Sequence, residues 1–129
     1  MARYKSPIPT ERELAILGIL WELGSGTVRQ VNEAMNEDSA TGYTTTLKLM
    51  QIMTEKGLLN RDDSQFKHVF RPAISEEKTQ SQLVGDLLDR AFAGSAEKLV
   101  MRALSAKKVS AEELGKIEKM LAEYKGAKS

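Results

Sequence analysis

The 129-residue sequence lacks cysteine and contains only three prolines, seven aromatic residues and one histidine. The absence of cysteine excludes a disulfide scaffold, a cysteine nucleophile and every cysteine-ligated metal site. No apolar run approaches the ~20 residues that cross a bilayer, and the N-terminus has no apolar signal-peptide core. We therefore expect a cytoplasmic protein with no membrane insertion. An excess of either charge is also lacking: 19 Lys and Arg against 18 Asp and Glu leave a net charge of +1, which gives no hint of a polyanionic partner.

The sequence also lacks any recognisable set of catalytic residues. The one histidine, His68, has no Asp or Glu at a spacing that suggests a metal-ligand set, so no metal site and no cofactor are expected. We interpret it as a polar surface or packing residue, with phosphate contact as the alternative. No serine has a visible base partner and no pair of general acids is evident. The sequence therefore does not predict an enzyme.

Helix start and stop signals dominate the first half of the chain. Thr10-Glu-Arg-Glu13 and Thr27-Val-Arg-Gln30 have the form of capping boxes, in which each side chain satisfies an orphan amide of the other residue. Gly24 follows one apolar-periodic run and Gly57 another, as helix C-terminal glycines do. These signals predict helices over 11–23, 28–36 and 42–56. A core-facing Trp21 and a loop over 37–41 complete this part.

The hydrophobic period then changes from that of a helix to that of a strand. Residues 58–62 predict one short strand, and 66–70 predict a second, half-buried strand that Pro72 ends. Phe66, His68 and Phe70 should share one face, residues 63–65 should form the turn, and Asp62 and Asp63 should close it. Three helices followed by a hairpin predict a winged helix-turn-helix domain over 1–73, in which the helix over 42–56 enters the DNA major groove.

The polar face of that helix predicts the DNA contacts. Threonine hydroxyls and methyls in its first turn can approach base edges, and a lysine can reach a guanine or a phosphate. The alternative is a solvated helix face. A cation at the start of the helix over 28–36 can share a phosphate with the helix N-terminus, and two further cations flank the wing. The candidate DNA-binding residues are Arg29, Tyr43, Thr44, Thr45, Lys48, Gln51, Arg61 and Lys67.

Residues 74–129 predict helices with narrow apolar stripes and too little internal material to cover them. Such stripes favour self-association through partner helices, and packing onto the first domain is the alternative. Residues 125–129 look frayed. The fold class is therefore mostly α with a small β-hairpin wing, namely a winged helix-turn-helix plus a C-terminal helical dimerisation region. The candidate dimerisation residues are Val84, Leu87, Leu88, Ala91, Leu99, Val100, Leu114, Ile117 and Leu121.

Several segments together resemble the penicillinase-repressor family of the BlaI/MecI type, which also includes copper-responsive CopY repressors. The resemblance rests on 9–17 with Leu20-Trp21, on Gly26-Thr-Val-Arg-Gln-Val31, and on the segments 41–57, 69–72, 87–92 and 94–95. It implies a homodimeric repressor that binds double-stranded DNA at an inverted-repeat operator. It also places Tyr43, Thr44, Thr45 and Lys48 at recognition-helix positions.

The same resemblance implies how repression ends. In the β-lactam branch a membrane sensor-protease, a further expected partner, triggers cleavage within the dimerisation helices. The matching segment here carries Arg102-Ala103 where cleaved members have an Asn-Phe pair, so cleavage, ligand binding and partner binding all stay open. The copper branch senses metal through a Cys-x-Cys pair, which this chain lacks. Another class of function, a winged-helix protein-interaction module without DNA binding, is compatible with the near-zero net charge.

Overall fold

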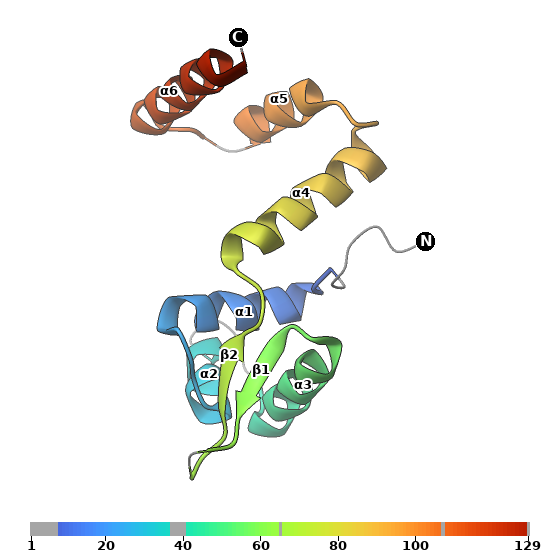
Figure 1. Cartoon of the computed structure of the whole chain (residues 1–129), viewed down its shortest axis with the longest axis vertical. Helices are drawn as coiled ribbons and strands as arrows, with labels where there is room; N and C mark the ends of the chain where they lie inside the picture. The colour runs from blue at the N-terminus through green and yellow to red at the C-terminus, as the bar shows by residue number, and fades with distance from the viewer. Residues whose placement is uncertain (1–7, 37–40, 65, 107, 129) are drawn as a thin grey trace. The chain divides into compact units, whose positions relative to one another are not determined.

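The computed structural model describes residues 8–36, 41–64, 66–106 and 108–128 (Figure 1). The predicted loop over 37–41 lies mostly outside the described residues. The chain divides into two compact units, Met1–Gly85 and Asp86–Ser129. None of the described helices is long and apolar enough to cross a membrane. The elements are, in order, α1 (Glu11–Leu23), α2 (Val28–Met35), α3 (Tyr43–Lys56), β1 (Leu59–Asp62), β2 (Val69–Pro72), α4 (Glu76–Ala91), α5 (Ala96–Ala106) and α6 (Ala111–Lys128).

Local capping explains why the helices of the first unit begin and end where they do. Both capping boxes are present: the Thr10 hydroxyl accepts from the amide of Glu13 at 3.2 Å, and the Thr27 hydroxyl accepts from that of Gln30 at 3.2 Å. The C-cap glycine of α3, Gly57, has φ +86°, a conformation that side chains with a Cβ rarely adopt. The helix predictions are confirmed to within one residue at each end.

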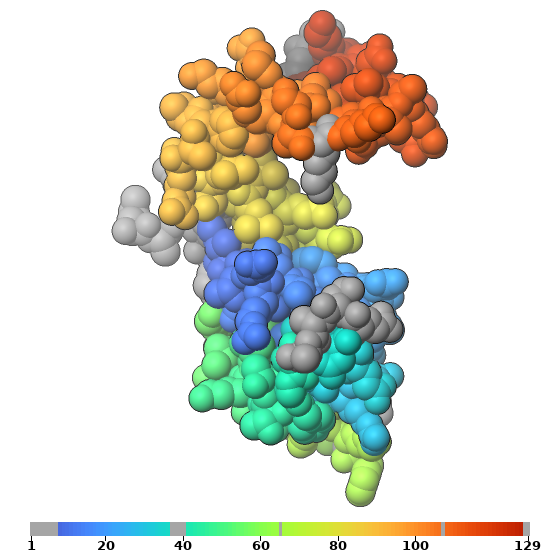
Figure 2. Space-filling model, turned by 180° about the vertical axis from the view of Figure 1, so that it is seen from behind, coloured from blue at the N-terminus to red at the C-terminus, as the bar shows by residue number. Residues whose placement is uncertain are grey.

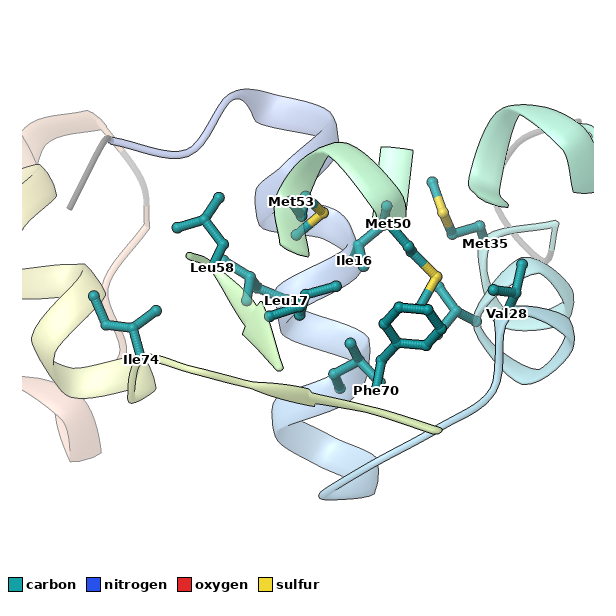
Figure 3. Close-up of a cluster of buried hydrophobic side chains, with 12 residues drawn as sticks. Ile16, Leu17, Val28, Met35, Met50, Met53, Leu58, Phe70 and Ile74 are labelled. Atoms are coloured by element: carbon teal, nitrogen blue, oxygen red, sulfur yellow. The ribbon is translucent and has the colours of Figure 1, made fainter. Parts of the chain in front are cut away.

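The core of the first unit lies where α1, α2, α3 and the hairpin meet (Figure 3). The sequence predicts that Trp21 faces the core, but the side chain is only half-buried and lies at the edge of the core. Its indole N–H donates to the carbonyl of Ile74 at 2.9 Å. That bond ties α1 to the segment that leaves the hairpin. The buried apolar residues are Ile16, Leu17, Leu20, Val28, Val31, Met35, Met50, Met53, Leu58, Leu59, Phe70 and Ile74.

The hairpin is extended by the turn between α1 and α2. β1 and β2 pair antiparallel, with Leu59 opposite Pro72 and Asp62 opposite Val69. Gly26 pairs with Phe70 on the other edge of β2, donating to its carbonyl at 3.0 Å and accepting from its amide at 2.8 Å. A Cβ at Gly26 would lie 3.2 Å from a methyl of Leu20, so this close approach favours glycine.

The predicted strand over 66–70 is wrong at its start. β2 begins at Val69, and Phe66 has an exposed fraction of 101% while Phe70 has one of 2%. The carboxylate of Asp62 accepts from both the amide and the hydroxyl of Ser64, at 2.9 and 2.6 Å, which turns the chain out of the ladder. Phe66 therefore has no position in the ladder, and the apparent alternation does not continue into it.

The helices of the second unit are regular but contribute no buried side chain among the described residues of α5 and α6. Ser95 and Ser110 cap their starts by accepting from amides three residues later, at 3.2 and 3.1 Å. The prediction that residues 125–129 fray is wrong as far as Lys128, where α6 ends. The alanine, lysine and glutamate residues of its last turns favour helix and explain the difference.

A buried carboxylate joins α1 to α3. Glu13 has an exposed fraction of 2%, accepts from the amide of Thr10 at 2.9 Å, and pairs with the ammonium of Lys56 at 2.8 Å. Burial raises the pKa of Glu13, but the hydrogen bond and charge of Lys56 and the amide of Thr10 outweigh it and hold the pKa below its ordinary value of 4.5. The ion pair therefore stabilises the fold above that pH and is lost as the carboxylate protonates.

Replacing Lys56 by methionine should lower the free energy of unfolding by about 1–3 kcal/mol at pH 7, because it leaves a buried carboxylate without its cation. The difference from the original chain should shrink as the pH falls below 4.5, where Glu13 protonates. Urea unfolding at several pH values measures both effects. Lys48→Met, which removes an exposed lysine of the same helix, is the control. Equal stability of the Lys56 variant and the original chain at pH 7 would contradict the ion pair's role.

Candidate nucleic-acid interface

The position of α3 is fixed at its N-terminus by a buried amide. Asn32 in α2 donates from Nδ2 to the carbonyl of Thr41 and to the hydroxyl of Thr46, each at 2.8 Å. Asn36 also holds Thr41, by accepting from its amide at 2.7 Å. Because Thr46 is wholly buried, these bonds fix both the position of Thr41 and the rotation of α3 about its axis.

The opposite face of α3 is open to solvent. Thr46, Met50 and Met53 face the core. In the first turn and on the outer face, the side chains form no hydrogen bond or ion pair with the part of the chain that the structure describes. Hydroxyl, ammonium and amide groups are thus free to bind a ligand. The exposed residues are Tyr43, Thr44, Thr45, Lys48 and Gln51.

A groove of about 790 Å³ runs between α3, the start of α2 and the wing. It brings together side chains from three separate segments of the sequence, among them three cations. Thr44, Thr45 and Lys48 lie outside it, further round α3. The predicted site residues that line the groove are Arg29, Tyr43, Gln51, Arg61 and Lys67; the other lining residues are Thr27, Val28, Leu47, Phe66, His68 and Phe70.

The cations of the groove differ in how freely they can bind an anion. Arg29 lies 3.5 Å from Glu33 in a pair whose side chains are both more than two-thirds exposed, an interaction that contributes little. Arg61 is held more firmly, because its Nε and Nη2 contact the two carboxylate oxygens of Asp63 at 2.8 and 3.2 Å. Lys67 is exposed and has no ion pair with any described residue. Asp63 therefore competes with an anionic ligand for Arg61.

Asp62 and Asp63 of the wing make different contacts, and only Asp62 closes the turn as the sequence predicts. Asp62 closes the turn, and the side-chain and backbone hydrogen bonds of Ser64 hold the pKa of that carboxyl below its usual value. Asp63 does not close the turn. Its Oδ1 instead lies 2.8 Å from the guanidinium of Arg61 and 2.6 Å from Nδ1 of His68. The wing thus carries a small cluster of paired charges.

Sequence reasoning missed four features of this site. Asn32 and Leu47 belong to no recognisable motif, and the alternating pattern predicts a strand at Phe66 instead of an exposed loop residue. His68 was interpreted as an isolated polar residue, yet it lines the groove and pairs with Asp63. The spacing of five residues across a predicted turn was the one available signal for that pair. Among the described residues, no group of three or more His, Cys, Asp and Glu could hold a metal ion.

Comparisons with known proteins bear on the family and the fold of the chain. A family model described as penicillinase repressor matches residues 9–123. The penicillinase repressor of Bacillus licheniformis is 23% identical over 124 residues, which cover 96% of this chain and 97% of that protein. The solution structure of monomeric B. licheniformis BlaI in complex with the blaP half-operator is similar with a TM-score of 0.50 and 23% identity, over 57% of this chain and 89% of BlaI. That likeness supports the predicted winged-helix fold.

Proposed function

The chain belongs to the penicillinase repressor family and is thus a DNA-binding repressor and not an enzyme, and from this premise we propose that it acts as a homodimer on an inverted-repeat operator. The observation that carries the proposal is the two-faced α3. One face is locked into the core by Thr46, Met50 and Met53, and the other is polar and exposed. A helix held in this way can enter a major groove without changing its own packing.

The roles of individual residues follow from where they lie. Thr44, Thr45 and Lys48 face away from the core and contact base edges in the major groove. Tyr43 and Gln51 lie at the edge of α3 that borders the groove, and they contact the flanking base or sugar. The groove itself holds a sugar-phosphate strand, with phosphates bound by Arg29, Arg61 and Lys67.

Dimerisation accounts for the apolar residues of the second unit. Leu87 is 45% exposed and Leu121 is 56% exposed, which is unfavourable for a helix that has no partner. We assign DNA binding to residues 1–73 and dimerisation to the helices from residue 74 onward. The proposed interface comprises Val84, Leu87, Leu88, Ala91, Leu99, Val100, Leu114, Ile117 and Leu121.

Relief of repression follows if a signal acts on these helices. Each subunit alone binds one half-site, and linking two subunits raises affinity by about 10²–10⁴-fold. The Arg102–Ala103 bond lies inside α5, of which no residue is buried. Local unfolding of such a helix costs little, so a protease can reach this bond once the dimer opens. A membrane sensor-protease is one partner that would supply this signal.

Replacing Lys48 by alanine should weaken binding to an operator duplex, selected from random DNA, by about 5–100-fold, because a contact in the major groove is lost. A gel-shift titration measures the affinity, and circular dichroism checks that the variant folds. Lys119→Ala removes an exposed lysine of α6 and should leave affinity unchanged. Unchanged affinity of the Lys48 variant would remove this lysine from the interface.

Replacing Asp63 by asparagine should tighten operator binding and steepen its dependence on salt, because Arg61 is released to bind a phosphate. Each added phosphate contact changes the slope of log affinity against log salt by about −0.9. Titrations at several salt concentrations measure both quantities. Arg61→Ala in the Asp63→Asn background should abolish the gain. A gain that persists in the double variant would show that lost negative charge, and not Arg61, is responsible.

Replacing Leu88 by aspartate should produce monomers, because it places a charge on the apolar stripe of α4. Sedimentation or light scattering measures the mass, and affinity for the full operator should fall while affinity for one half-site stays the same. Arg90→Gln lowers the charge of the same helix by the same amount, at an exposed position about 160° round the helix from Leu88, and should leave the dimer intact. A dimeric Leu88 variant would reject this stripe as the interface.

A further inference from the structure

One aromatic side chain contributes nothing to the fold as described. Phe66 is fully exposed, and the wing segment that carries it lies outside the β1–β2 ladder. The tip of the hairpin projects beyond the helices of the first unit in both views (Figures 1 and 2). A single exposed apolar side chain is common on protein surfaces, and this ring is distinguished by its position at the tip, beside the cations of the groove.

The surroundings of Phe66 identify the chemistry of a partner. Lys67 follows it directly and has no ion pair with the described residues, and both side chains line the groove beside Arg29. An apolar ring among cations matches a surface whose walls are apolar and whose rims are anionic. The DNA minor groove has these properties, because deoxyriboses form its walls and phosphates its rims.

The position of the groove gives the order of contacts along DNA. One of its sides is α3, through Tyr43, Leu47 and Gln51, and the opposite side is the wing. If α3 occupies a major groove, the sugar-phosphate strand at its border fills the groove of the protein. The next feature of the duplex beyond that strand is the adjacent minor groove, and the wing is the element on that side.

We propose that Phe66 enters the minor groove that flanks each half-site, with Lys67 on the phosphate rim. This inference rests on the proposed function, because it requires α3 in the neighbouring major groove. It adds specificity outside the bases that α3 reads. The amino group of guanine fills the floor of the minor groove, so the ring fits A·T pairs better. Flexible pyrimidine–purine steps open most readily around an inserted apolar side chain.

The test compares Phe66→Ala, Phe66→Leu and Lys67→Ala with the original full-length chain on an operator duplex selected from random DNA. Phe66→Ala should weaken binding about tenfold and leave the salt slope unchanged, because an apolar contact releases no counterions. Phe66→Leu should restore most of the affinity. Lys67→Ala should instead reduce the steepness of the salt slope by about 0.9.

Two further measurements locate the contact. Hydroxyl-radical footprinting reports minor-groove deoxyriboses, and the original chain should protect those beside each half-site whereas Phe66→Ala should not. A selection from random duplexes should show an A·T preference in the flanks that the alanine variant loses. Because Phe66 is fully exposed, the variant should melt at the same temperature as the original chain.

The outcomes separate the two proposals. If the original chain binds no duplex at low salt, the proposed function fails. If it binds, but Phe66→Ala keeps its affinity, footprint and flank preference, the inference about Phe66 alone is overturned. A change of mass in sedimentation on Phe66→Ala would also overturn it, because the ring would then belong to a contact between copies of the chain.

Discussion

The two hydrogen bonds of the Glu13 carboxylate are the contacts on which the geometry of the first unit depends. The two carboxylate oxygens bind the amide that begins α1 and the ammonium that ends α3. At the other end of α3, Asn32 donates to the carbonyl of Thr41 and to the buried hydroxyl of Thr46. A helix held by polar contacts at both ends and by methionine side chains between them has little freedom to slide or rotate. The exposed face of α3 is therefore presented in one orientation before any ligand binds.

The same contacts explain how much of this structure the sequence can predict. Capping boxes and C-cap glycines act within three or four residues, so the limits of α1, α2 and α3 are readable to within a residue. The pair of Glu13 and Lys56 spans 43 positions, and no local pattern signals it. The start of β2 is missed for a related reason: the ladder ends at the pair of Asp62 and Val69, because the bonds from Ser64 to Asp62 turn the chain there, whereas the apparent alternation continues past that point to Phe66.

The candidate site shows the same division between what is local and what is not. The exposed face of α3 follows from helical periodicity, so the sequence alone predicts that Tyr43, Thr44 and Lys48 are exposed. The groove follows from the packing of the wing against α2 and α3, and so the hold of Asp63 on Arg61 emerges only in three dimensions. Residue type predicts a cation at Arg61, but only the geometry indicates that this cation is already paired.

The pairing of Arg61 gives the net charge of +1 a mechanistic meaning. Non-specific affinity for DNA comes mainly from counterion release, and a cation that is already paired within the protein, as Arg61 is, releases fewer counterions when it contacts a phosphate. In the proposed homodimer, affinity then depends more on base edges, on apolar contacts and on the second subunit. Of these sources, the second subunit is the one that a signal can remove without altering the α3 surface. A low positive charge and exposed apolar stripes in α4, α5 and α6 both fit the mechanism that we propose, in which control acts on the association of subunits.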